Sequence, residues 1–202
     1  RSSASFVRSR LGQEERPILT KKEMGYTRKG GALILVGSHV PGSTSQLESL
    51  LNLPNVYGLE LDVHKALQHD KDQIISITEQ TDRLLAESKD IVIYTSREVV
   101  TGSSPDEYLE IGTTITEAIT EVVSDITITP RYIISKGGMT SSNIIVNALK
   151  IKRATVPGQI ASGVLVLQLG LESKYPGSKL ILWPGNVGGP TAISDVVLRM
   201  RT

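Results

Sequence analysis

The sequence predicts an α/β protein, a single three-layer domain in which a mostly parallel sheet is covered by helices on both faces. Strand-like apolar segments alternate with helical patterns, and the connections between them are short. The first strand, residues 32–36, is apolar throughout, as expected for a strand buried on both faces. A chain of 202 residues is also long enough to build one core without disulfides.

The start of the chain differs in character from the rest. Residues 1–29 are polar, and we expect them to be a lead-in segment from an inter-domain region. A short helix over residues 4–12, closed by Gly12 as a C-cap, is expected within this segment. Residues 30–202 are then expected to form the folded domain.

Helical and strand patterns follow each other after the first strand. A helix is expected around Leu47 and Leu50, then a strand over residues 56–63 and a third strand over residues 90–94. Between these two strands, one apolar stripe with helical spacing predicts an amphipathic helix. Its members are Ile74, Ile77, Thr78, Thr81, Leu84 and Leu85.

The next helix has the clearest start signal in the sequence. Ser104 is a natural N-cap, Pro105 occupies the first helical position, and Glu107 completes a capping box. An apolar stripe follows at helical spacing, and we interpret it as the core face of the helix. It consists of Tyr108, Ile111, Ile115, Ala118, Ile119 and Val122.

A strand over residues 131–135 runs directly into a glycine turn. Thr140 or Ser141 is expected to cap the following helix, which has its inner face at Ile144, Ile145, Ala148 and Leu149. Three further strands are expected at residues 154–156, 163–169 and 179–183. A closing helix begins near Pro190 and has apolar positions at Ala192, Ile193, Val196 and Val197.

Composition excludes several classes of function. Lys and Arg number 22 against 21 Asp and Glu, so no basic excess indicates a nucleic-acid or membrane partner. Without cysteine there is no disulfide framework, thiolate zinc site or cysteine nucleophile. No apolar run approaches the roughly 18 to 20 residues of a membrane span, and residues 1–10 lack the apolar region of a secretory signal. We expect a cytoplasmic protein.

Three loops at predicted strand ends are rich in glycine and hydroxyl residues: residues 37–39, 136–142 and 184–189. In open α/β sheets, ligands bind at the carboxyl ends of strands. Glycine lets backbone N–H groups approach an oxyanion, and a helix N-terminus favours negative charge. These loops therefore predict a phosphate site, although a Gly-Gly pair after a strand can also be a simple tight turn. Lys136 adds a positive charge to the second loop. The candidate binding residues in the three loops are Ser38, Lys136, Gly137, Gly138, Met139, Thr140, Gly185, Asn186 and Gly188.

Known nucleotide fingerprints are absent from these loops. Residues 37–43 begin like a G-x-x-x-x-G-K-[ST] loop but lack its lysine, and no G-x-G-x-x-G follows the first strand. The second absence argues against a Rossmann-like oxidoreductase.

Residues 136–141 (KGGMTS), 156–160 (VPGQI) and 183–189 (WPGNVGG) resemble the C-terminal domain of the four-carbon acid sugar kinases. Residues 37–38 and 94–97 fall where that family has similar turns. The resemblance covers nearly the whole chain and keeps the order of the motifs. The opening residues 3–8 are similar to the stretch that precedes this domain in longer members of the family.

The resemblance implies an ATP-dependent kinase of carbohydrate metabolism, a transferase acting on a small sugar acid such as a threonate, an erythronate or a 3-oxo-tetronate. In that family an N-terminal domain holds the sugar acid and the C-terminal domain holds ATP, which implies ATP and Mg²⁺ as cofactors and an N-terminal substrate-binding domain as partner. Ser38 and the turn from Gly137 to Thr140 would then contact the nucleotide, with Gly185 lining the same pocket. The isolated domain is expected to be inactive, its catalytic residues are unassigned, and a homo-oligomer is left open.

The sequence departs from the family at two positions that leave a second reading open. Many members have an acidic residue where Met139 stands and an aspartate near Asn143. These departures favour the alternative of a non-catalytic nucleotide-binding or docking module in a multidomain protein.

A few other residues carry side hypotheses. Asp62, His64, His69 and Asp70 form a local group of acidic and imidazole side chains. Within it, Asp62 and His64 are a candidate metal pair by residue type if the strand continues, weighed against a strand end followed by a solvated helix start. Trp183 is either an adenine-stacking side chain or a core aromatic. Arg97 either pairs with phosphate or braces the sheet. His39 beside Ser38 resembles a nucleophile with its base only by residue type, because neighbouring side chains point apart on an extended chain.

Overall fold

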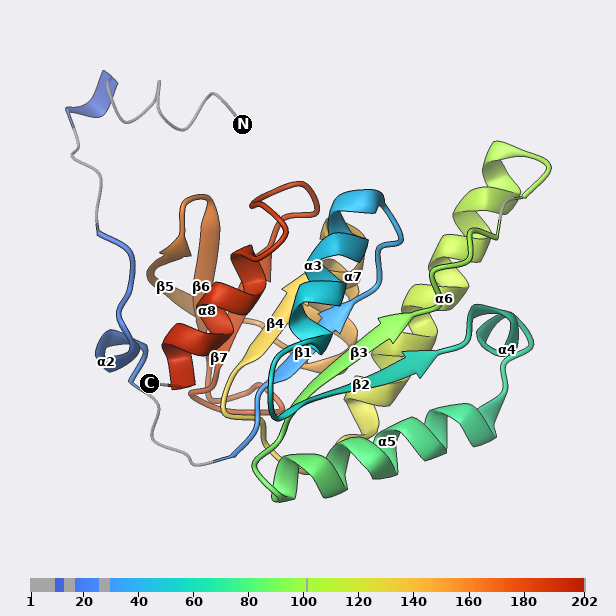
Figure 1. Ribbon diagram of the computed structural model, residues 1–202, viewed down its shortest axis with the longest axis horizontal. Coiled ribbons are helices and arrows are strands. Elements are labelled where there is room, and N and C mark those ends of the chain that lie inside the picture. Colours follow the sequence, from blue (N-terminus) through green and yellow to red (C-terminus); the bar gives the residue numbers. More distant parts are fainter. Residues whose placement is uncertain (1–9, 13–16, 26–29, 101, 202) are drawn as a thin grey trace.

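The structure is a computed structural model that describes residues 10–12, 17–25, 30–100 and 102–201 (Figure 1). Residues 3–8, and most of the helix predicted over residues 4–12, lie outside this part of the chain.

The described part of the chain folds into a domain of seven strands and the helices named below. The strands are β1 (Leu33–Val36), β2 (Val56–Leu61), β3 (Asp90–Thr95), β4 (Ile133–Lys136), β5 (Ala154–Ala161), β6 (Val164–Leu169) and β7 (Lys179–Trp183). The helices are α2 (Lys21–Met24), α3 (Pro41–Leu51), α4 (Val63–Leu67), α5 (Lys71–Ala86), α6 (Pro105–Asp125), α7 (Gly138–Asn143), the π-helical turn η1 (Ile144–Ala148) and α8 (Ala192–Arg201).

All seven strands form one sheet in the order β2-β3-β1-β4-β7-β6-β5. The first five strands in this order, β2, β3, β1, β4 and β7, pair in parallel. The last two, β6 and β5, add an antiparallel edge. The turn between β5 and β6 passes through Gly163, whose φ of 76° suits glycine. The mostly parallel sheet predicted from the alternating pattern is therefore confirmed.

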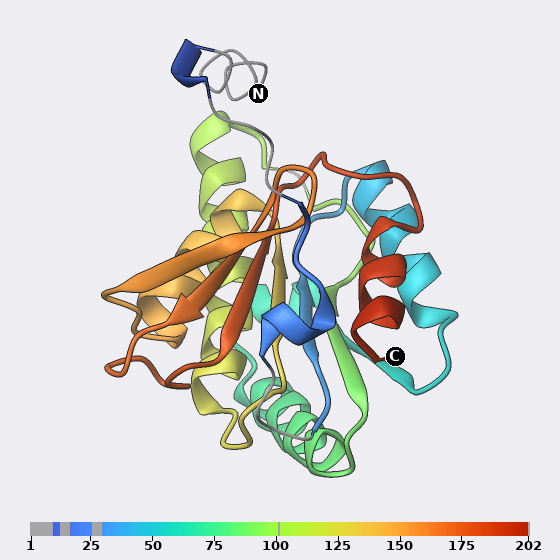
Figure 2. The same cartoon turned by 90° about the vertical axis from the view of Figure 1, so that its left-hand side faces the viewer.

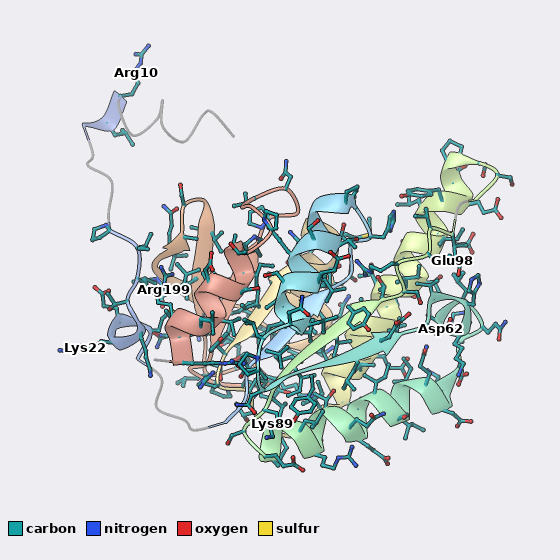
Figure 3. The ribbon with its side chains drawn as sticks, in the orientation of Figure 1. Arg10, Lys22, Asp62, Lys89, Glu98 and Arg199 are labelled. Carbon is teal, nitrogen blue, oxygen red and sulfur yellow. The ribbon has the colours of Figure 1, made fainter. Side chains whose placement is uncertain are left out.

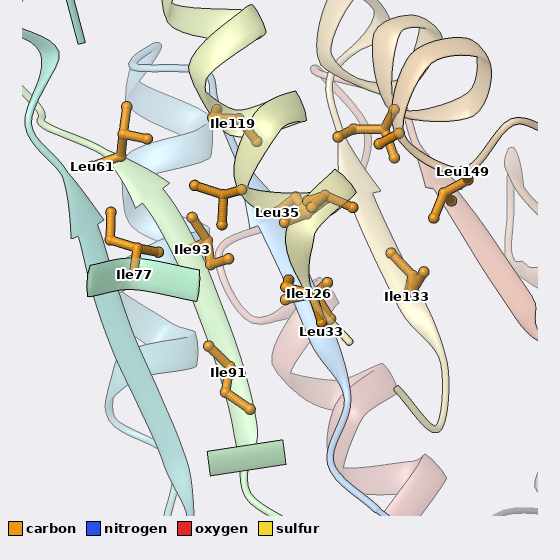
Figure 4. Packing of buried hydrophobic residues seen from close by; sticks show 14 of the residues in the cluster. Leu33, Leu35, Leu61, Ile77, Ile91, Ile93, Ile119, Ile126, Ile133 and Leu149 are labelled. Carbon is orange, nitrogen blue, oxygen red and sulfur yellow. The ribbon is translucent and has the colours of Figure 1, made fainter. Parts of the chain in front are cut away.

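Helices cover both faces of the sheet, as predicted (Figure 2). On one face α5, α6 and η1 pack on a cluster that includes Leu33, Leu35, Ile93 and Ile133 (Figure 4). On the other face α3 and α8 pack on alternate residues of the same strands, among them Ile34 and Ile134. Because side chains alternate across a strand, each central strand supplies apolar residues to both cores, which explains its continuous apolar sequence.

Several predicted boundaries differ from the structure: β5 runs to Ala161 instead of ending at residue 156, and most other strand ends shift by one or two residues. Two of the differences have a clear local cause. The strand predicted over residues 56–63 ends at Leu61, because the Asp62 carboxylate accepts hydrogen bonds from His64 N and Lys65 N and begins α4 as its N-cap. The helix after β4 begins at Gly138 with Gly137 as N-cap, so neither Thr140 nor Ser141 is the cap. Gly137 has a φ of 104°, which glycine alone adopts without strain.

The predicted start of α6 is confirmed, with one displacement in its capping box. Ser104 Oγ accepts a hydrogen bond from Glu107 N at 3.2 Å. The Glu107 carboxylate reaches back to Ser103 N at 2.7 Å, one residue before the cap. The helix is 21 residues long, about 31 Å, and its N-terminal part extends past the end of the sheet (Figure 1).

A buried carboxylate joins three segments at the amino end of the parallel strands. Asp90 is 3% exposed and accepts hydrogen bonds from Ala32 N, Arg131 Nη2 and Arg201 Nε at 2.7, 3.3 and 2.8 Å. Arg201 also donates to Pro54 O at 2.7 Å. This group ties α8 and the β3 and β4 strand starts to the lead into β1.

Across the described ranges, we find no helix with both the length and the apolar character needed to cross a bilayer.

Candidate functional site

A pocket of about 490 Å³ lies at the carboxyl ends of the parallel strands, between the loops after β1, β3, β4 and β7 and the N-terminal half of α6. This volume is in the range of small-molecule sites. Of the residues predicted to bind phosphate, seven line it: Ser38, Gly137, Gly138, Met139, Thr140, Gly185 and Asn186. The three glycine loops are thus brought to one place by the parallel topology, as the sequence predicts.

The turn after β4 presents backbone donors to this pocket. The first helical hydrogen bond of α7 runs from Ser141 N to Gly137 O at 3.1 Å. The N–H groups of Gly138, Met139 and Thr140 therefore fall in the first turn, where donors have no partner inside the helix. The helical path continues through η1 to Ala148. Such an N-terminus favours an anion.

The loop after β1 approaches this turn very closely. A Cβ placed on Gly37 would lie 2.6 Å from Thr140 Oγ1 and 3.2 Å from Ile119 Cδ1. Only a glycine at this position lets Ser38 and the Gly137–Thr140 turn face the same pocket. The Ser141 hydroxyl fixes the other side of the turn, because it donates to Ser135 O at 3.2 Å and meets Ser135 Oγ at 2.9 Å.

We expect Gly37→Ala to lower the free energy of unfolding by about 1 to 3 kcal/mol, because the added methyl group overpacks this contact. Urea denaturation measures the loss. Gly138→Ala is the matched control, since a Cβ there meets nothing within 4 Å. It should leave stability unchanged or raise it by up to about 1 kcal/mol. Equal stability of Gly37→Ala and the wild type would contradict the close approach.

Lys136 does not line the pocket, contrary to the prediction that it supplies a charge there. It lies on the same face of β4 as Ile134, toward α3 and α8, and is 1% exposed. Its Nζ donates to Gly185 O at 3.2 Å, and burial lowers the pKa of the ammonium group. Lys136 therefore positions the loop that carries Gly185.

Gly188 also lies outside the pocket lining, in the loop after β7. Gln46 of α3, which is 2% exposed, directs its Nε2 at the carbonyl oxygens of Val187, Gly188 and Gly189 at 2.9 to 3.1 Å. Trp183 is buried on this same face and donates from Nε1 to Val187 O at 2.9 Å. Trp183 is thus a core aromatic that shapes the loop, and the adenine-stacking alternative is wrong.

Arg97 braces the loops, which decides between its two predicted roles. Its guanidinium donates to Ser38 O at 2.7 Å and, through Nε, to Thr95 O at 3.0 Å. Ser96 Oγ accepts from Val63 N at 3.2 Å and so ties the end of β3 to α4. These contacts hold the β1 and β3 loops at the pocket rim. Among the described lining residues, His39, Glu98 and Tyr108 carry ionisable side chains, but none is Lys or Arg.

The sequence reading missed the wall that α6 contributes. Tyr108, Ile111 and Ile115 belong to the stripe that the sequence predicts as the core face of the helix. They line the pocket together with Leu109, Gly112 and Thr116, and Ile115 also packs against the core cluster as predicted. The reason is that the first half of α6 extends beyond the sheet, so its apolar stripe meets the pocket there. Gly112 is the one feature of the sequence that could have indicated this wall, because glycine destabilises the interior of a helix and is unexpected there.

The acidic and imidazole group around Asp62 has structural roles. Asp62 and Asp70 cap α4 and α5, and His64 Nε2 lies 3.2 Å from Glu98 Oε2 at the rim; Asp62 and Glu98 are labelled in Figure 3. In the part of the chain that the structure covers, no group of three or more His, Asp or Glu residues is arranged to hold a metal ion. The metal-pair hypothesis is not supported.

Among solved structures, the chain is similar to the Haemophilus influenzae protein HI1011 of the DUF1537 family, with a TM-score of 0.68 and 21% identity over 96% of the chain. It is also similar to two crystal forms of a Bordetella bronchiseptica DUF1537 protein, each a domain-swapped dimer with bound citrate. Their TM-scores are 0.64 and 0.62, with 15% and 16% identity over 89% and 88% of the chain. No curated protein matches the chain significantly.

The chain spans 45% of the Haemophilus protein and 41% of the Bordetella protein. At these identities the likeness concerns the fold. The sequence itself matches the family described as the nucleotide-binding C-terminal domain over residues 33–193, a range that contains all the glycine loops of the pocket. The chain therefore belongs to the nucleotide-binding C-terminal domain family.

Proposed function

We propose that this chain is the ATP-binding domain of a kinase that phosphorylates a four-carbon sugar acid of the threonate, erythronate or 3-oxo-tetronate type. The observation that carries the proposal is the Gly137–Thr140 turn, which opens a helix at the end of β4 and shares one pocket with Ser38 and Gly185. The resemblance of the three glycine loops to the acid sugar kinases supplies the substrate class. In this proposal residues 30–202 are the nucleotide-binding domain and residues 1–29 lead in from a substrate-binding domain.

Phosphoryl transfer depends mostly on positioning and on neutralising charge. The turn offers its backbone N–H groups to the phosphates, and Ser38 and Thr140 add hydroxyl donors at the same pocket. Glu98 is the one carboxylate among the described lining residues. Since Mg²⁺ is usually bound by one or two carboxylates together with substrate phosphates, this donor set fits an ion that arrives with ATP. The sugar acid and the base that activates its hydroxyl come from the N-terminal domain.

A second candidate is a non-catalytic nucleotide-binding or docking module. The observation that favours it is Met139, which is 50% exposed at the pocket in a turn without a carboxylate. Asn143 donates from Nδ2 to Met139 O at 3.3 Å and so supports the turn.

A turnover assay separates the two candidates. The protein that joins this domain to its N-terminal substrate-binding domain is incubated with ATP, Mg²⁺ and a panel of four-carbon sugar acids, and ADP release is followed. The kinase proposal predicts ADP release that depends on one of the acids. The 202-residue chain alone should bind ADP and release none from ATP. ADP binding without turnover on any acid would favour the non-catalytic module.

A further inference from the structure

We propose that the wall of α6 centred on Gly112 is the subsite for the nucleobase and ribose of the bound nucleotide. The inference rests on the proposed function, because it assigns the part of the pocket that the phosphate turn does not occupy. Gly112, Tyr108 and Leu109 are the residues that define this wall.

Gly112 lies in the interior of a 21-residue helix, where glycine is unfavourable compared with alanine. No neighbouring atom requires it, because a Cβ at this position would meet nothing within 4 Å. Its φ is also not in the left-handed region. Gly112 lines the pocket, so the space that a side chain would fill is open pocket volume. The missing side chain leaves room for a ligand group to pack against the helix.

The side chains around Gly112 suit a flat apolar group. Tyr108 is 49% exposed and Leu109 is 58% exposed, although both line the pocket. Val100 faces the same pocket from the loop before α6. Apolar and aromatic side chains that converge on a partly open pocket are typical of small-molecule sites, and an aromatic ring offers a stacking surface to a base.

The wall also lies at a suitable distance from the phosphate turn. Ile119 of α6 lies close to the phosphate end of the pocket, because a Cβ on Gly37 would meet both its Cδ1, at 3.2 Å, and Thr140 Oγ1, at 2.6 Å. Gly112 precedes Ile119 by seven residues on the same helix, which is roughly 10 Å along the axis. A nucleotide whose phosphates bind at the Gly137–Thr140 turn would therefore extend along α6 toward Gly112 and Tyr108.

The test uses Gly112→Leu, which places a helix-compatible side chain in this space. Titration calorimetry in the presence of Mg²⁺ measures the affinity of the 202-residue chain for ADP and, separately, for inorganic pyrophosphate. We expect the affinity for ADP to fall by about tenfold or more, because the leucine side chain occupies the space proposed for the base. Pyrophosphate affinity should stay within about twofold. Thr113→Leu is the matched control, because it puts the same side chain one residue further on the exposed face of α6.

A second variant separates this effect from damage to the fold. Gly112→Ala should raise the melting temperature by about 2 °C, because it removes a helix-interior glycine, and should still weaken ADP binding. Unchanged ADP affinity in Gly112→Leu, with affinity lost in Gly138→Val, would overturn the base subsite and leave the phosphate site standing. Equal losses for ADP and pyrophosphate would also overturn it. A wild-type chain that binds neither ligand would instead contradict the proposed function.

Discussion

Asp90→Ala is expected to lower the free energy of unfolding by about 3 kcal/mol or more. The Asp90 carboxylate is buried and accepts hydrogen bonds from two arginines and the backbone N–H of Ala32. Removing it leaves the guanidinium groups of Arg131 and Arg201, which are 19% and 20% exposed, without their counter-charge. Urea denaturation followed by circular dichroism measures the change.

Glu121→Ala is the control for this variant. Its partner Lys71 lies 2.6 Å away in an ion pair whose side chains are 41% and 64% exposed. Exposed pairs contribute little, so the loss should be below about 1 kcal/mol. A similar loss of unfolding free energy in the two variants would contradict the claim that the buried Asp90 carboxylate stabilises the fold.

Gly138→Val is expected to weaken nucleotide binding by roughly 100-fold, or about 2.7 kcal/mol. A Cβ on Gly138 meets nothing in the protein, so the fold accommodates the new side chain. The added methyl groups occupy the space in front of the first-turn N–H groups of α7, where the phosphates are proposed to lie. Calorimetric titration with ADP and Mg²⁺ measures the affinity.

Gly42→Val is the matched control for Gly138→Val. Gly42 also lies in the first turn of a helix and also has open space at its Cβ, but it does not line the pocket. Its ADP affinity should equal that of the wild type. A Gly138→Val protein that remains folded and binds ADP as the wild type does would place the phosphates elsewhere.

The sheet and its two cores could be predicted from local patterns. Residues 33–36 and 90–95 are buried on both faces, so their composition alone marks them as central strands. Glycine loops at strand ends are also local signals, because parallel strands carry their ends to one edge. The position of the pocket and the place of Ser38, Gly138 and Gly185 in it follow from that edge.

Features that depend on which way a side chain points could not be predicted in the same way. Lys136 is the last residue of β4, and a shift of one residue along the strand would turn its side chain to the other face of the sheet. In the structure it lies beside Trp183 and on the same face as Ile134, so it points into the core under α3 and α8. The role of α6 depends on how far it extends past the sheet, which its periodicity does not encode. The sequence therefore predicts core positions at Tyr108 and Ile111, which line the pocket instead.

The most direct test of the central claim is a titration of the ¹⁵N-labelled chain with ADP and Mg²⁺, followed by backbone amide shifts in the NMR spectrum. If the nucleotide binds at the glycine turn, we expect saturable shifts that are largest at Gly138, Met139 and Thr140, with accompanying shifts at Ser38 and Gly185. Amides of the β5–β6 hairpin should stay unchanged. Shifts concentrated on that hairpin, or an unchanged spectrum at millimolar ADP, would contradict nucleotide binding at the glycine turn.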